Sequence, residues 1–493
     1  MPEPDSPKKK IAVIGAGFGG LSAAIHLRAA GHEVVVFEKN KEPGGKLHRH
    51  QENGYTWDIG PSLLTMPHLL EELWTAAGQN LADDLELIRL PITCRYRWTD
   101  GTVIDENAAF WQLPEVSAFL DYARGLWDIS EDAFLRNALD HLPRQFKPAN
   151  WQKLKHFRDL SNPATLDKVV RRYFDDPHLI QLFNRFATYN GSSPYQTPSA
   201  FNIIPYVQAK FGGWTVKGGM ANVAAAVGAL AERCGAELRC QQMVTELRPI
   251  AAGWEVQCGD RIERFDGVVS NQDALTATDG WLPHRLRKKF IKRQLHKRDL
   301  SLSGFAMLLG VKRKYAELSH HNILFSDNYQ LEFEQLFKRQ RPPMPPTIYI
   351  AVNSITESEL APYGCDNWFV LVNMPPNPEE ELYWTPERCR QYGDQVIDRM
   401  SEYGLRDVRE SITERHEISP AQFQSRSMAW RGCLYGFASH GTLSAFKRPA
   451  MRPPGLKRFV FAGGTTHPGG GIPLVLLSGR IAAGLLNEEL EQS

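Results

Sequence analysis

The first forty residues alternate between strand-like and turn-like sequence in an order that few folds accommodate. An apolar run at 11–14 is typical of a buried strand, and three glycines follow it at the spacing G-x-G-x-x-G: Gly15, Gly17 and Gly20. A helix-like stretch over about 21–30 then leads to a second apolar run, Val34–Phe37, which ends at Glu38. This order predicts a strand, a glycine turn, a helix and a second strand, the start of a dinucleotide-binding βαβ unit.

Each of these residues has a separate physical role in such a unit. Gly15 allows the tight turn, Gly17 lets the backbone approach a pyrophosphate, and Gly20 lets the helix pack close to the strand. The first amide groups of the helix would point at the phosphates. Glu38 lies 23 positions after Gly15, close to the spacing of about 20 expected for a carboxylate that accepts a hydrogen bond from a ribose hydroxyl.

Two further glycine turns favour FAD over a nicotinamide dinucleotide. Gly44 and Gly45 come soon after Glu38 and suit a backbone that approaches a second face of a larger cofactor. Near the C-terminus, an apolar run at 459–462 leads into the glycine-rich turn 463–473 and then into a helix that reaches about 490. The cofactor-binding part is therefore expected to be assembled from separate segments.

Size, charge and cysteine usage narrow the class of protein. At 493 residues the chain has room for two or three domains, and its formal net charge of +1 argues against a nucleic-acid partner. The seven cysteines are scattered without any C-x-x-C, which is typical of a reducing compartment and indicates neither a disulfide framework nor a metal site. The polar start is too short for a signal peptide, and no run of 18 apolar residues predicts a membrane-spanning helix.

The predicted fold class is α/β: an FAD-binding Rossmann-type domain with an antiparallel-sheet substrate domain and a helical insertion. Residues 235–238 are expected to enter a strand that ends near Met243 and Val244. Long β-type runs without βαβ spacing predict the antiparallel sheet, at 305–311, 347–352 and 368–372. Helical spacing over 105–200 predicts the insertion.

These patterns lead to an expected division of the chain. Residues 1–8 are expected to be a disordered tail. The FAD-binding domain is expected to be discontinuous and to comprise 9–104, 205–275 and 420–493. The substrate-binding and membrane-facing domain is expected to comprise 105–204 and 276–419.

Taken together, the motifs resemble the FAD-dependent carotenoid desaturases of the phytoene-desaturase type, over nearly the whole chain. This resemblance implies an amine-oxidase-like flavoprotein architecture and an oxidoreductase that acts on CH–CH groups. One position departs from many phytoene desaturases, which carry alanine where this chain has Gly470. There the chain looks more like relatives late in the pathway, the 3,4-desaturases and terminal-methyl oxygenases. The motifs that carry the resemblance are 15–20, Glu38 with 43–46, 57–62, 213–219, 268–271, 361–364 and 464–473.

The resemblance also implies which residues bind FAD. The first glycines and Glu38 would hold the ADP half, Val244 would contact the adenine side, and the C-terminal motif would line the ribityl chain and flavin ring. The full expected set is Gly15, Gly17, Phe18, Gly19, Gly20, Glu38, Lys39, Gly44, Gly45, Lys46, Gly60, Pro61, Ser62, Val244, Gly464, Thr465, Ile472, Pro473 and Leu474.

The implied reaction needs few catalytic side chains. The flavin accepts a hydride or its equivalent, and the polyene spreads the developing positive charge. The proton acceptor is left open between a carboxylate and water, with no choice among Asp121, Asp128, Asp140, Asp175 and Asp176. His467 is a candidate base or a structural residue, and Cys433 is a flavin tether or, more simply, a buried thiol. The electron acceptor is a quinone or oxygen.

An acyclic C30 or C40 carotenoid substrate would be drawn from a bilayer, so we expect a cytoplasmic protein that is peripheral to the membrane. The stretch Trp281–Asp299 combines eight basic residues and one acid with interleaved apolar positions, which is typical of an interfacial amphipathic helix. The alternative for this stretch is a solvated basic helix or a nucleic-acid patch.

Two other functions fit the same motifs less well. One is a different flavin oxidase on this fold, such as an amine or protoporphyrinogen oxidase. The other is a prenyl-binding escort protein that uses no flavin. Intact glycine turns and the acid at Glu38 argue against the escort protein.

Overall fold

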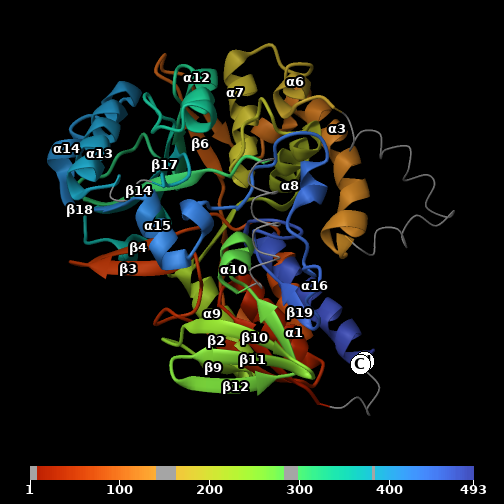
Figure 1. Cartoon of the computed structure of the whole chain (residues 1–493). Coiled ribbons are helices and arrows are strands. Elements are labelled where there is room, and N and C mark those ends of the chain that lie inside the picture. Colours follow the sequence, from red (N-terminus) through yellow and green to blue (C-terminus); the bar gives the residue numbers. More distant parts are fainter. Residues whose placement is uncertain (1–7, 140–162, 282–297, 380–382, 493) are drawn as a thin grey trace.

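The protein is described by a computed structural model over residues 8–139, 163–281, 298–379 and 383–492. Two large sheets dominate it. A parallel sheet lies in the lower part of Figure 1, and a mixed sheet lies above it. Among the described residues, no helix is long and apolar enough to cross a bilayer.

The parallel sheet confirms the predicted Rossmann-type unit. Its strand order is β19-β13-β1-β2-β9, and every neighbouring pair is parallel. The first helix begins earlier than predicted, because the turn residue Gly17 is already its N-cap. The elements are β1 (Lys10–Ile14), α1 (Phe18–Ala29), β2 (Glu33–Phe37), α9 (Ala221–Arg233), β9 (Glu237–Arg239), β13 (Gly267–Ser270), β19 (Phe459–Phe461) and α16 (Ile472–Glu491).

The single strand expected from 235 to about 244 is wrong. Strand β9 ends at Arg239, and a separate strand, β10, begins at Val244. Between them, Gln241 has a φ of 56°, in the left-handed region, and its N–H donates to the Asn40 carbonyl oxygen at 3.0 Å. The chain therefore turns there and enters a second, antiparallel sheet of β10 (Val244–Ile250), β11 (Gly253–Cys258) and β12 (Arg261–Phe265).

The mixed sheet confirms the predicted antiparallel runs. Its order is β18-β14-β17-β16-β15-β6-β7, and all pairs are antiparallel except β15 with β6. Since β6 belongs to this sheet, a boundary drawn from the sheets would fall before Cys94. The strands are β6 (Cys94–Arg97), β7 (Val103–Glu106), β14 (Ser303–Val311), β15 (His321–Leu324), β16 (Ile348–Val352), β17 (Asp366–Met374) and β18 (Ile412–Ile418).

The two faces of the mixed sheet have different partners. One face packs against α13 (Pro386–Met400), where Val396 and Met400 meet Met307 and Val370. On the opposite face, Phe369 and Leu308 pack against the hairpin of β3 (His48–Glu52) and β4 (Tyr55–Ile59). Successive strand residues point to opposite faces, so alternating positions along β14 and β17 divide between these two environments.

The region between 105 and 211 is largely helical where it is described. A cluster of aromatic rings joins its helices, with Phe174 stacked on Phe183 at 4.5 Å and Phe119 4.7 Å from Phe183. Helix α8 packs on α3, although its residues from 205 onward fall within the segment expected to bind FAD. The domain division therefore stays a proposal. The helices are α3 (Pro114–Ser130), α6 (Leu166–Val170), α7 (Pro177–Arg185) and α8 (Ile203–Phe211).

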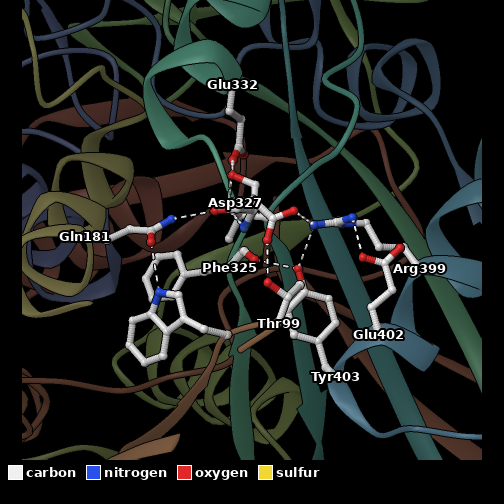
Figure 2. A network of polar contacts seen from close by, with 11 residues as sticks. Thr99, Gln181, Phe325, Asp327, Glu332, Arg399, Glu402 and Tyr403 are labelled. Atoms are coloured by element: carbon white, nitrogen blue, oxygen red, sulfur yellow. Dashed lines mark hydrogen bonds and ion pairs between the residues drawn. The ribbon is translucent and has the colours of Figure 1, made fainter. Parts of the chain in front are cut away.

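A polar network joins the helical region to the mixed sheet and α13 (Figure 2). Asp327 accepts hydrogen bonds from Thr99 and, at 2.9 Å, from Arg399 of α13. On the other side, Gln181 of α7 donates to the Ser326 carbonyl oxygen at 2.8 Å. These contacts fix three elements to the loop that follows β15. The remaining elements are β5 (Leu87–Arg89), β8 (Trp214–Val216), α2 (His68–Ala76), α10 (Ala274–Trp281), α12 (Tyr329–Phe333), α14 (Val408–Ser411) and α15 (Pro420–Ser427).

The first and last long helices touch without room for a side chain between them. A Cβ atom placed on Gly479 of α16 would lie 2.6 Å from Ser22 Cβ and 2.8 Å from the Ala23 backbone nitrogen on α1. Ser22 Oγ also donates to the Leu476 carbonyl oxygen at 2.8 Å. This contact brings the C-terminal glycine turn against the N-terminal one.

We predict that Gly479→Ala lowers thermal stability and flavin retention, because overpacking against backbone atoms typically costs about 1–3 kcal/mol. Gly484→Ala on the same helix is the matched control. Its added Cβ meets nothing within 4 Å, so helix propensity should leave stability equal or higher. Thermal melting and flavin absorption of both variants test this. Equal melting temperatures for the two would contradict the close packing.

Candidate active site

A cavity of about 640 Å³ runs between the two sheets and reaches into the helical region. Seventeen of the nineteen residues expected to bind FAD lie in its wall. The two exceptions are Gly19 and Gly20. A Cβ on Gly20 would meet the Gly15 carbonyl oxygen, and one on Gly19 would lie 3.0 Å from Gly463 Cα. These two glycines therefore allow close packing behind the wall.

Asn271, the residue after β13, holds the glycine turns together. Its N–H donates to the Ile14 carbonyl oxygen at 2.8 Å, and its Nδ2 donates to the Ala462 carbonyl oxygen at 3.0 Å. A Cβ on Gly17 would lie 2.5 Å from Asn271 Oδ1. The Asn271 side chain thus occupies space that is free only because the turn residues are glycines. The sequence motif 268–271 contains this residue but does not reveal its position between the turns.

Glu38 is buried at the end of β2 and braces the first turn. Its Oε2 accepts a hydrogen bond from the Ala16 N–H at 2.8 Å. Its Oε1 accepts from both the N–H and Nδ2 of Asn40, each at 2.8 Å. The carboxylate also lines the cavity. Its free lone pairs remain available to a hydroxyl, because each carboxylate oxygen accepts more than one hydrogen bond.

Lys46 brings a basic side chain to the cavity wall. Its Nζ donates to the Leu434 carbonyl oxygen at 2.6 Å. Burial lowers the pKa of Lys46, and nearby Asp273 acts in the opposite direction. Burial raises the pKa of Asp273, whose Oδ1 accepts from the Leu275 N–H at 2.9 Å and caps α10. Asp273 Oδ2 is buried and has no hydrogen-bond partner among the described residues.

Of the residues considered for proton transfer or tethering, those within the described ranges do not line the cavity. His467 is buried outside the wall, where its Nε2 donates to the Asn137 carbonyl oxygen at 2.9 Å and its ring contacts Phe134. This favours its structural interpretation. Cys433 is buried and free, and burial raises the pKa of its thiol to about 12, which favours an inert thiol. None of Asp121, Asp128, Asp175 and Asp176 lines the cavity, and Asp140 lies outside the described residues.

The part of the cavity beyond the glycine turns is mostly apolar. One wall is the inner face of the mixed sheet, and the other consists of α8 and the end of α3. Alternating strand residues supply the sheet wall because they share one face. The lining side chains from these elements include Ile323, Phe369 and Leu371 from the sheet, Ile203, Ile204 and Val207 from α8, and Trp127 from α3.

Polar residues gather in one region of this apolar chamber, and no sequence motif indicates them. Arg185, at the C-terminal end of α7, lines the wall with Tyr189. Tyr349 and His321 do so from neighbouring strands. Tyr349 OH is hydrogen-bonded to His321 Nδ1 at 2.7 Å and to Ser62 Oγ.

The glycine-lined half of the cavity fits FAD. The two N-terminal turns come so close that a Cβ on Gly45 would lie 3.1 Å from Gly17 Cα. Gly60 has a φ of 126°, and a Cβ there would collide with the Lys46 carbonyl oxygen. The backbone can therefore approach a long cofactor from several sides without side chains between them. The N-terminus of α1, which has no side-chain cap, presents free amide groups suited to a pyrophosphate.

The family described as flavin containing amine oxidoreductase matches residues 18–487. The chain belongs to this family. It is therefore a flavin-dependent oxidoreductase with FAD as its cofactor, and the predicted fold class, enzyme class and cofactor are confirmed.

Relatives of known name confirm the resemblance to carotenoid-pathway flavoproteins. A 4,4'-diapolycopene oxygenase from Methylomonas sp is 34% identical over 98% of this chain and 99% of that protein. A 1-hydroxycarotenoid 3,4-desaturase from Flavobacterium sp. (strain P99-3) is 33% identical over 97% and 99%. Among solved structures, cyclohexylamine oxidase from Brevibacterium oxydans IH-35A has a TM-score of 0.61 at 17% identity, covering 98% of this chain and 100% of that one. This last likeness concerns the fold alone.

We predict that Glu38→Ala weakens FAD binding about tenfold to a hundredfold, since a hydrogen bond to a charged group contributes about 1.5–3 kcal/mol. The loss of the Ala16 contact should loosen the turn as well. Glu33→Ala on the same strand is the control, because Glu33 is exposed and lies outside the wall. Fluorescence titration of both apoproteins with FAD gives the dissociation constants. An unchanged constant for Glu38→Ala would remove this carboxylate from the cofactor site.

Proposed function

We propose that this flavoprotein oxidises an acyclic C30 or C40 carotenoid, introducing carbon–carbon double bonds at the surface of a membrane. The observation that carries the proposal is the continuity of the cavity. The glycine-lined cradle opens directly into a chamber walled by an apolar sheet face and by α8. An extended hydrocarbon lying in that chamber would place its end beside the cofactor cradle.

The chemistry fits the residues present. When bound, FAD accepts a hydride equivalent from a saturated carbon beside the polyene. The substrate also loses a proton, so each new double bond removes two hydrogens, which a quinone or oxygen finally receives. The apolar walls orient the chain and exclude water. Delocalisation along the polyene lowers the demand for a strong base, consistent with a wall in which His467, Asp121, Asp128, Asp175 and Asp176 are absent from the described lining.

A terminal-methyl oxygenase is the second candidate, and Gly470 is the observation that favours it. A Cβ at Gly470 would lie 2.5 Å from Cδ1 of Tyr435, and both residues line the cavity. An alanine, as in many phytoene desaturases, would displace this ring. Glycine there leaves room for the Tyr435 ring in the cavity wall. The two named relatives are a 4,4'-diapolycopene oxygenase and a 1-hydroxycarotenoid 3,4-desaturase.

We predict that the purified, flavin-loaded protein converts acyclic carotenoids to products absorbing at longer wavelength. Parallel reactions with a quinone and with oxygen identify the electron acceptor. Mass spectrometry separates the outcomes, because desaturation removes two hydrogens for each double bond and oxygenation adds oxygen. Oxidation of an amine or a porphyrinogen, with carotenoids unchanged, would overturn the proposal. A protein that binds polyene without flavin would instead be an escort protein.

The membrane part of the proposal rests on the basic stretch at 281–299. Residues 282–297 lie outside the described residues. Trp281, at the end of α10, lines the cavity, so the stretch begins at the cavity wall. Trp281 packs near Phe37 and Val244, so attachment there would bring the cofactor end of the cavity next to lipid, where a carotenoid is dissolved.

Charge reversal tests this attachment. We predict that a fourfold charge-reversal variant no longer binds anionic liposomes, since each basic residue near such a surface contributes about 1 kcal/mol. The variant carries Lys288→Glu, Lys289→Glu, Lys292→Glu and Arg293→Glu. FAD content should stay normal, and turnover of liposome-embedded carotenoid should fall more than turnover in detergent. Equal sedimentation of variant and parent with liposomes at low salt would show that the stretch is a solvated surface.

A further inference from the structure

The chamber contains a buried positive charge that the reaction does not use. Arg185 is 9% exposed, and its Nη1 donates to the Tyr96 hydroxyl at 3.1 Å. The guanidinium lies 5.5, 5.7 and 5.2 Å from the ring centroids of Tyr96, Phe186 and Tyr189. These rings hold the group in place against the cavity wall.

The guanidinium has more donors than its surroundings have acceptors. It carries five N–H groups, and its hydrogen-bond partner among the described residues is the hydroxyl of Tyr96. The carboxylate of Glu106 is already engaged, by the Tyr96 hydroxyl at 2.6 Å and by Gln208 Nε2 at 2.5 Å. Several N–H groups of Arg185 are thus left for an acceptor inside the cavity.

A second polar group lies in the same neighbourhood. The Tyr349 hydroxyl joins Ser62 Oγ to His321 Nδ1. His321 Nε2 is buried and has no hydrogen-bond partner in the described part of the chain. Ile323 of β15 pairs with both Tyr96 of β6 and Tyr349 of β16, so these rings share one face of the sheet, and Arg185 is bonded to the Tyr96 hydroxyl beside them. Unpaired buried polar groups are costly, so a wall built only for hydrocarbon would not contain them.

We propose that the polar wall formed by Arg185, Tyr349, His321 and Ser62 binds a carbonyl or hydroxyl oxygen on one end of the polyene substrate. This inference rests on the proposed function and specifies its substrate class. An acceptor oxygen would pair with the free guanidinium N–H groups, while the remaining hydrocarbon lies along the sheet face and α8. A hydrocarbon end would leave those donors unpaired.

A role in proton removal fits these side chains less well. Burial lowers the pKa of His321 well below its usual value, and the Arg185 charge lowers it further, so the imidazole is a weak proton acceptor. Burial acts to lower the pKa of Arg185, but the surrounding Tyr96, Tyr189 and Glu106 raise it above its ordinary value, so this group stays charged and donates only. The neutral His321 imidazole and the charged Arg185 guanidinium can both donate a hydrogen bond to an oxygen.

The experiment compares two acyclic polyenes of equal length and conjugation on the flavin-loaded enzyme. One ends in hydrocarbon and the other in an aldehyde or a hydroxyl. We expect the oxygen-bearing polyene to have at least a tenfold higher kcat/KM. Arg185→Gln should lower that preference at least tenfold, mainly through KM, and Arg185→Lys should retain part of it. The absorption of a bound conjugated aldehyde should lose its shift to longer wavelength in Arg185→Gln.

Arg399→Gln is the matched control, because the side chain of Arg399 is comparably buried and belongs to the network of Figure 2, outside the cavity. It should leave the preference between the two polyenes as in the parent. If Arg185→Gln does not fold, Tyr349→Phe removes a single hydroxyl and should lower the preference about threefold. A parent enzyme with no preference, or variants that keep it while folded and flavin-loaded, would overturn this inference. Failure of the parent to oxidise either polyene would instead overturn the proposed function.

Discussion

The structure depends on backbone turns that meet around the side chain of Asn271. The first glycine turn, the end of β13 and the turn after β19 approach so closely that a Cβ atom on Gly17, Gly19 or Gly463 would collide with that side chain. Close packing of backbone leaves amide groups directed at the cavity in place of side chains. A long anionic cofactor can then be bound by the fold itself, with Glu38 fixing the first turn from the neighbouring strand.

The same constraint explains why the two ends of the chain meet. The turn after β19 is positioned by α16, and α16 can approach α1 only because Gly479 has no side chain. Ser478 Oγ, one residue earlier, accepts from the Gly463 N–H at 2.9 Å and donates to the His467 carbonyl oxygen at 2.7 Å. The cofactor cradle is therefore complete only when α16 is in place. In the sequence, the mixed sheet lies between the N-terminal and C-terminal segments of the cradle.

Local sequence predicted the parts that local chemistry determines. The unit β1–α1–β2 was readable because apolar periodicity and turn glycines act over a few residues. The strand expected near 235–244 was wrong because the left-handed conformation of Gln241 comes from its contact with Asn40, not from its residue type. Arg185 gave no signal either: a basic residue at the end of a helix is usually solvated, and only tertiary packing buries it.

The apolar and polar parts of the cavity wall together determine which substrates the enzyme can distinguish. Transfer of a methylene group from water to an apolar site contributes about 0.8 kcal/mol, but a bilayer already supplies that to a carotenoid. The apolar chamber therefore gains little free energy from hydrocarbon length alone, and mainly fixes the direction of the chain. With the proposed substrate, discrimination would come from shape at Gly470 and Tyr435 and from unpaired donors such as those we propose for Arg185. A binding site that leaves polar groups unpaired for the wrong ligand rejects it more strongly than a hydrophobic pocket rejects an extra methylene.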